Sequence, residues 1–116
     1  MVWIPDETAY AGRNVLDTPD DACDVAGHER TRTDLWGSEA ARALGATFLP
    51  QLADTDLQVE PGQLALFQRE CEVLLAHAAE LSVVTGFKAD YIAARLSFIV
   101  QAVQRAQALG GGVLIW

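Results

Sequence analysis

Two cysteines and two histidines are the side chains of this sequence best suited to nucleophilic or acid–base chemistry near neutral pH. Cys23 and Cys71 lie far apart and neither belongs to a C-x-x-C pair, so neither a zinc knuckle nor a dithiol redox motif is indicated. Cys71 falls on the apolar side of an expected helix, where a free thiol usually packs as a small hydrophobic group. His77 flanks the same helix among alanines, and His28 lies in a polar stretch. A small enzyme that uses these groups is therefore the least favoured alternative, and we predict no catalytic residue.

Spaced carboxylates are the second candidate for chemistry, because oxygen ligands suit hard cations. They form one cluster of Asp17, Asp20, Asp21 and Asp24, and a second cluster of Asp54, Asp56 and Glu60. A calcium loop that starts at Asp54 needs Gly at its sixth position and Glu at its twelfth, where the sequence has Val59 and Ala65. The first cluster follows no ligand spacing and suits the start of a helix capped by Thr18. We therefore predict no metal ion and no cofactor.

The charge of the chain is concentrated in its first half. The net charge is −8; residues 1–60 hold twelve acids and four bases, and residues 61–116 hold four of each. A negative field of this kind repels phosphate backbones and anionic membrane surfaces. The sequence therefore predicts a protein partner of basic character and neither nucleic acid nor membrane.

The composition also bears on where the protein works. No run of about 18 uncharged apolar residues is present, and residues 1–6 lack the basic and apolar parts of a secretory signal. Seven arginines against one lysine, with abundant alanine and leucine, are typical of a GC-rich bacterial genome. We expect a bacterial cytoplasmic protein.

Two long helices dominate the second half of the sequence. The first should begin at Pro61 and run to about Thr85, with Gly86 as its stop, and the second should run from residue 88 or 89 to Leu109. In the first helix, apolar residues recur at steps of three and four: Leu64, Phe67, Cys71, Leu74, Leu75, Ala78 and Leu81. The second helix is apolar on most sides, which predicts a central, antiparallel position beside the first.

Shorter elements are expected around this hairpin. One helical turn or two are predicted in the acidic N-terminal segment, and a helix over 34–44 should begin at Asp34 or Ser38. Residues 57–59 alternate as in a short strand, and the runs 1–4 and 113–116 can pair as adjacent strands. Trp116 should complete that strand, the alternative being an apolar tag for a partner.

The predicted architecture is mainly α, with α+β as the alternative: a long antiparallel helical hairpin, one or two short N-terminal helices and short terminal strands. A single domain should cover residues 1–116. Its parts are the acidic N-terminal segment 1–33, the short helix and connector 34–60, the helical hairpin 61–109, and the Gly turn with terminal strand 110–116.

A protein-binding module is the leading functional hypothesis, and an inhibitor of the immunity or antitoxin type is its most concrete form. A small acidic domain is steered rapidly to a positive cleft, where carboxylates can occupy sites meant for phosphate. Both acidic clusters are candidate contacts, and Trp36 is a candidate anchor if it is exposed. The alternative is a structural or assembly subunit that forms homo-oligomers, such as a homodimer, through the helical hairpin.

Overall fold

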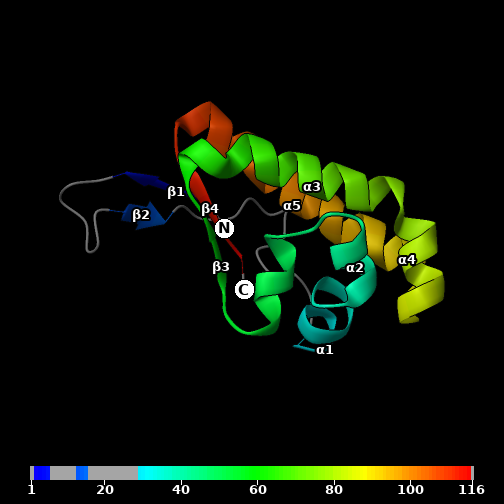
Figure 1. Ribbon diagram of the computed structural model, residues 1–116. Coiled ribbons are helices and arrows are strands. Elements are labelled where there is room, and N and C mark those ends of the chain that lie inside the picture. Colours follow the sequence, from blue (N-terminus) through cyan, green and yellow to red (C-terminus); the bar gives the residue numbers. More distant parts are fainter. Residues whose placement is uncertain (1, 6–12, 16–28, 116) are drawn as a thin grey trace.

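The computed structural model describes residues 2–5, 13–15 and 29–115 (Figure 1). Its helices are α1 (Glu29–Thr31), the π-helix η2 (Arg32–Trp36), α2 (Glu39–Ala43), the 3-10 helices η3 (Leu49–Ala53) and η4 (Pro61–Gln63), α3 (Leu64–Ala76), α4 (Ala78–Thr85) and α5 (Ala89–Leu109). Its strands are β1 (Val2–Pro5), β2 (Arg13–Val15), β3 (Leu57–Val59) and β4 (Gly112–Ile115). The described part of the chain is mainly α-helical with a small sheet, which confirms the predicted fold class.

The helical hairpin forms as the apolar stripe predicts (Figure 1). Phe67 and Leu74 of α3 are buried in one core with Ile92 and Leu96 of α5. Helix α5 also contacts α4, β1 and β4, so it is the central helix. Both α4 and α5 end at a glycine in the left-handed region: φ is 83° at Gly86 and 70° at Gly110. A side chain with a β-carbon would be strained there, which explains why the sequence predicted both ends correctly.

The first long helix is interrupted, contrary to the expectation of one helix from residue 61 to 85. His77 leaves the helical conformation at φ −109° and ψ 20°, and it separates α3 from α4. Its backbone N–H donates to the carbonyls of both Val73 (3.2 Å) and Leu74 (3.1 Å). Its ring nitrogen Nδ1 lies 2.8 Å from the same Val73 oxygen, so the side chain folds back onto the helix end. Such competition for a helical carbonyl loosens the turn and bends the helix.

The four strands form an antiparallel sheet in the order β2-β1-β4-β3, which joins the two ends of the chain. The predicted pairing of the terminal runs is therefore confirmed for the described residues, whereas Trp116 lies outside them. Trp3 is paired with Gly112, and a β-carbon on Gly112 would collide with the Trp3 indole. The glycines after α5 thus provide both a helix end and room for a tryptophan.

The predicted helix over 34–44 is two short helices. The backbone N–H of Gly37 donates to the carbonyl of Arg32 at 3.0 Å, which closes the wide turn of η2. Ser38 then caps α2, because its hydroxyl accepts the N–H of Ala41 at 3.1 Å. Of the two predicted caps, Ser38 is therefore the correct one. The helical turn expected between residues 18 and 27 lies outside the described residues.

Candidate functional site

Three of the predicted partner-binding carboxylates surround an outer strand of the sheet. Asp54 and Asp56 lie between η3 and β3, and Glu60 follows β3 directly. All three are exposed, and within β3 the side chains of Leu57 and Val59 are buried. We call the segment 54–60, with its three carboxylates, the acidic edge, because β3 pairs with β4 on one side and is one of the two outer strands of the sheet.

One arginine reaches the acidic edge from η2. Arg32 Nη2 lies 3.2 Å from Asp56 Oδ1, and Arg32 Nε donates to the carbonyl of Leu52 at 2.8 Å. The backbone N–H of Glu60 donates to Gln63 Oε1 at 3.1 Å, which fixes the turn into η4. Arg32 thus offsets part of the charge of Asp56, and the Glu60 side chain accepts a backbone N–H of η4 in a capping box. The edge keeps a negative potential that a cationic partner can sense.

Of the other predicted partner contacts, four lie outside the described residues and one is buried. Asp17, Asp20, Asp21 and Asp24 lie outside the described residues. Trp36 does not meet the condition set for an anchor: its exposed fraction is 0%. The wide turn of η2 directs Leu35 and Trp36, which are consecutive, into the same core. Trp36 is therefore a core residue, and its assignment as a surface anchor is corrected.

A buried carboxylate that the sequence pattern did not reveal lies at the junction of α3 and η3. Glu70 is 9% exposed. Its Oε1 accepts the backbone N–H groups of Thr47 (2.5 Å) and Phe48 (3.0 Å), and its Oε2 accepts that of Leu49 (2.8 Å). Leu49 begins η3, and Thr47 and Phe48 directly precede it, where N–H groups have no helical partner of their own. Glu70 therefore acts as a helix cap from a distant part of the chain.

The position of Glu70 in the sequence already placed its side chain on the buried side of the helix. It lies three residues after Phe67 and four before Leu74, so it shares their side of the helix. A charged residue on an apolar stripe is buried only when it finds hydrogen-bond partners. Those partners are backbone groups more than twenty residues away, which helical spacing cannot identify.

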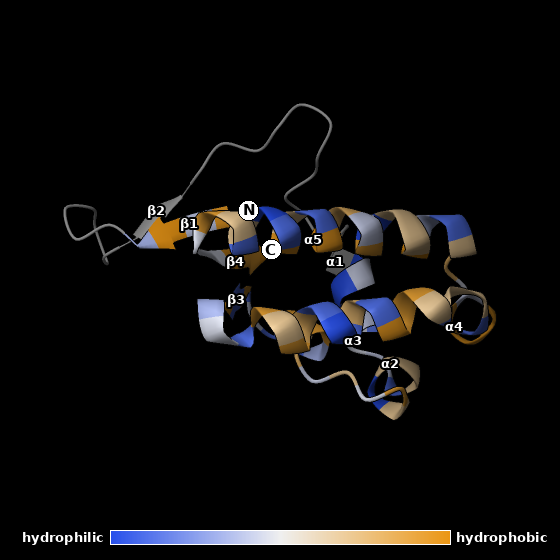
Figure 2. Ribbon diagram, turned by 90° about the horizontal axis from the view of Figure 1, so that it is seen from above, coloured by the Kyte–Doolittle hydropathy of each residue, from blue (hydrophilic) through white to orange (hydrophobic). Residues whose placement is uncertain are grey.

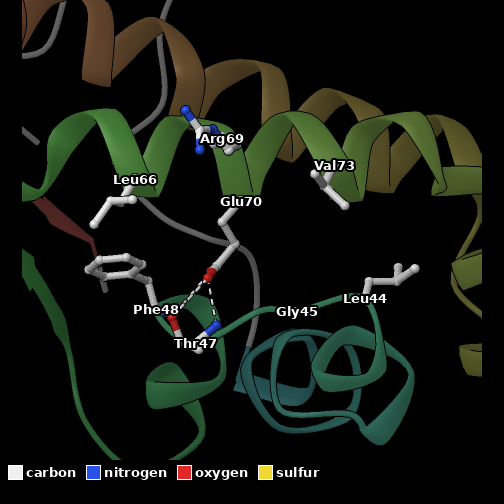
Figure 3. A pocket seen from close by; sticks show the side chains of 8 residues that line it. All are labelled: Leu44, Gly45, Thr47, Phe48, Leu66, Arg69, Glu70 and Val73. Atoms are coloured by element: carbon white, nitrogen blue, oxygen red, sulfur yellow. Dashed lines mark hydrogen bonds between the residues drawn. The ribbon is translucent and has the colours of Figure 1, made fainter.

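A hollow of about 260 Å³ opens beside Glu70 (Figure 3). Leu66, Arg69 and Val73 line it from α3, and the segment that follows α2 closes the other side through Leu44 and Phe48. The Glu70 carboxylate turns toward the loop and its N–H donors, as the dashed lines in Figure 3 show. The open surface of the hollow is therefore mostly apolar.

A second hollow, of about 210 Å³, lies between α2 and α4 and shares Leu44 with the first. Val84 of α4 lines this hollow and is 71% exposed, and the adjacent Val83 is 86% exposed. Leu66 of α3, which lines the first hollow, is 60% exposed. Figure 2 shows the apolar colouring of α4 at its end of the hairpin.

The candidate nucleophile and base are both held in structural positions. Cys71 is buried, and burial, followed by the nearby charges of Glu70 and Glu72, raises the pKa of its thiol far above the usual range. The thiolate is the reactive form of cysteine, so this thiol is a poor nucleophile. His77 Nδ1 lies within hydrogen-bond distance of a helix carbonyl. Cys23 and His28 lie outside the described residues.

Two stacked aromatic rings with an arginine at each end join α1 to α5. Phe87 and Tyr91 stack with 6.0 Å between ring centroids; the Arg30 guanidinium lies 5.6 Å from the Phe87 centroid and that of Arg95 lies 5.2 Å from the Tyr91 centroid. The hydroxyl groups of Thr31 and Tyr91 are 2.8 Å apart. These contacts fix the start of α5 against α1.

Within the described residues, no group of three or more histidine, cysteine, aspartate or glutamate side chains is arranged to hold a metal ion. No helix in the same part of the chain has the length and apolar character needed to cross a membrane.

No protein-family model matches the chain, and comparisons with curated proteins and with solved structures found no significant similarity. Function must therefore be inferred from the geometry of the surfaces described above.

Proposed function

We propose that this protein is a binding module that docks a positively charged protein partner on its acidic edge. Its most concrete form is a bacterial cytoplasmic inhibitor of the immunity or antitoxin type, which covers a basic active site. The observation that carries the proposal is the exposure of Asp54, Asp56 and Glu60 at the two ends of one outer strand. The overall charge of −8 has the same sign and strengthens the long-range attraction.

The geometry of the acidic edge suits a protein better than a small cation. The three carboxylates are spread over the two ends of β3, and Asp56 is already paired with Arg32. A partner with several lysines or arginines can contact separated carboxylates at once, and electrostatic complementarity of this kind raises the association rate. The acidic residues also discourage a second copy of the chain from pairing with the outer strand.

The states of Cys71 and His77 favour binding over catalysis. The thiol is buried and its pKa is raised, and the imidazole contacts the end of its own helix. Catalysis by these two groups at neutral pH would require both of them to leave these positions.

Affinity capture tests the proposal. Tagged protein is incubated with lysate of the native host and washed at about 50 mM and about 300 mM salt, because screening weakens surface ion pairs over this range. Retained proteins are identified by mass spectrometry. We expect a basic protein at low salt that is depleted at high salt.

Matched variants make the capture specific to the acidic edge. The triple variant Asp54→Asn, Asp56→Asn, Glu60→Gln raises the net charge by three, and so does the control Gln68→Lys, Glu72→Lys on α3. The edge variant should lose the basic protein and the control should keep it. Equal loss in both variants would mean that only the overall charge matters, which contradicts the proposed site.

A further inference from the structure

The outer side of β3 presents backbone hydrogen-bonding groups at the margin of the sheet. β3 pairs with β4 on one side (Figure 1), and no strand among the described residues pairs with its other side. A β-carbon on Gly112 would collide with the carbonyl oxygen of Val59, so this carbonyl points toward β4. In an antiparallel strand the N–H and C=O groups of successive residues point to opposite sides. Those of Gln58, which lies between Leu57 and Val59, therefore point outward.

Both ends of this open side are occupied by contacts within the chain. The N–H of Glu60, which points to the same side as that of Gln58, donates to Gln63 Oε1 at 3.1 Å. At the other end, Asp56 Oδ1 lies 3.2 Å from Arg32 Nη2. Gln58 itself is exposed. It is therefore the residue of β3 at which an additional strand can form both of its backbone hydrogen bonds.

The side chains around Gln58 give the open side a definite charge pattern. Leu57 and Val59 are buried in the core, so by alternation Asp56, Gln58 and Glu60 lie on the opposite, exposed face. The two carboxylates stand two residues before and two residues after Gln58. Each already has a partner within the chain, but the two oxygens of a carboxylate accept several hydrogen bonds.

An antiparallel strand added at this side would meet the carboxylates in a fixed register. One of its residues lies opposite Gln58 and exchanges two backbone hydrogen bonds with it. The residues two positions before and two positions after that one then face Glu60 and Asp56. Basic side chains at these two positions, four residues apart, form cross-strand pairs of opposite charge. A second copy of β3 cannot supply them, because it would bring carboxylates against carboxylates.

We propose that the acidic edge binds its partner by strand addition. An extended segment of the partner pairs antiparallel with β3 at Gln58, and two lysines or arginines four residues apart in that segment face Asp56 and Glu60. The backbone hydrogen bonds hold the segment, and the carboxylates select its charge. Strand addition rests on the proposed function, and it specifies the form in which the basic partner is bound.

Synthetic peptides test the backbone contact and the charge register separately. The first peptide is Thr-Lys-Val-Thr-Val-Lys-Thr with both ends blocked. The second is N-methylated at the central threonine, which removes the N–H that would donate to the Gln58 carbonyl. The third has the same composition with its two lysines adjacent. Each peptide is titrated into the isotope-labelled full chain to about 5 mM and followed by two-dimensional NMR, a range that covers weak binding.

The first peptide should bind with a Kd of the order of 1 mM, because a short flexible peptide loses much freedom when it is ordered. The largest change of amide chemical shift should be that of Gln58. The N-methylated peptide should bind about fivefold more weakly, because one backbone hydrogen bond is lost. The peptide with adjacent lysines should bind about threefold more weakly, because only one lysine can face a carboxylate.

Two variants of Gln58 test the same contact from the side of the protein. Gln58→Pro removes the outward N–H without changing the charge, and proline is tolerated in an outer strand when its nitrogen faces away from the sheet. Gln58→Thr is the matched control, because it keeps the N–H. The first peptide should bind to the threonine variant and not to the proline variant. If Gln58→Pro does not fold, as judged by circular dichroism, the comparison of the first two peptides on the wild type decides the question.

The outcomes separate strand addition from the proposed function. Equal binding of the first two peptides, lost in the edge variant Asp54→Asn, Asp56→Asn, Glu60→Gln, overturns strand addition and leaves attraction by charge at the acidic edge. Unchanged binding of the first peptide to a folded Gln58→Pro variant also overturns it. No change of chemical shift at residues 54–60 up to about 5 mM of the first peptide overturns it as well, and capture from lysate then tests the proposed function independently.

Discussion

Glu70 and the acidic edge present the same chemical group in opposite surroundings. Glu70 is buried and accepts three successive backbone N–H groups, whereas Asp54, Asp56 and Glu60 are exposed around an outer strand. A carboxylate whose hydrogen-bonding capacity is used inside the chain stabilises the fold. Exposed carboxylates contribute less to stability and remain accessible to an external partner, which is the role proposed for the acidic edge. Glu60 combines both situations, because it is exposed and also caps η4.

Trp36, like Glu70, has a structural role. Replacing it should have the largest effect on the free energy of unfolding. The change Trp36→Ala empties a fully buried site and should lower the free energy of unfolding by about 4 kcal/mol. Urea denaturation followed by circular dichroism measures the loss. Val83→Ala, at an exposed position, should stay within about 0.5 kcal/mol of the wild type. A small loss from Trp36→Ala would contradict the core role assigned to this residue.

Removal of the Glu70 carboxylate should cause the next largest loss of unfolding free energy. The change Glu70→Ala leaves three N–H groups at the start of η3 without an acceptor, which should cost about 3 kcal/mol. Glu70→Gln keeps one oxygen acceptor and should cost less. The neighbouring exposed Glu72→Ala is the control and should change the unfolding free energy by less than about 0.5 kcal/mol. Equal losses from Glu70→Ala and Glu72→Ala would remove the distinction between buried and exposed carboxylates.

The thiol of Cys71 makes a smaller contribution to stability, and this contribution depends on pH. Its pKa is raised in the folded protein by burial and by neighbouring acids, so unfolding releases a proton once the pH exceeds the ordinary thiol pKa of about 8.5. The stability contributed by the protonated thiol is therefore complete below that pH and is lost as the pH rises. The difference in stability between the wild type and Cys71→Ala should shrink by about 1.4 kcal/mol per pH unit above about pH 8.5. A difference that stays constant from pH 7 to 10 would contradict a buried, protonated thiol.

The local elements that the sequence predicted well are those fixed by near neighbours. Gly86 and Gly110 end helices because a left-handed residue is needed there, and the spacing of Phe67, Cys71 and Leu74 defines the buried side of α3. These signals act within a few residues, so a single sequence contains them in full.

The elements that the sequence did not predict depend on contacts between distant segments. Glu70 is buried because backbone groups after α2 bind it, and Trp36 is buried because η2 adopts a wide turn that sends it into the core. The break at His77 depends on which way one imidazole turns. The candidate site was predicted in part: the positions of Asp54, Asp56 and Glu60 around an outer strand could not be read from spacing, because strand order is a property of the whole fold.

Hydrogen exchange measured by mass spectrometry, with and without the basic protein recovered by capture, tests the role of the acidic edge most directly. We expect partner-dependent protection of the backbone at residues 54–60 and no change across α3 and α4. Protection confined to α3 and α4, with residues 54–60 unaffected, would show that the partner binds elsewhere and would contradict the proposed function.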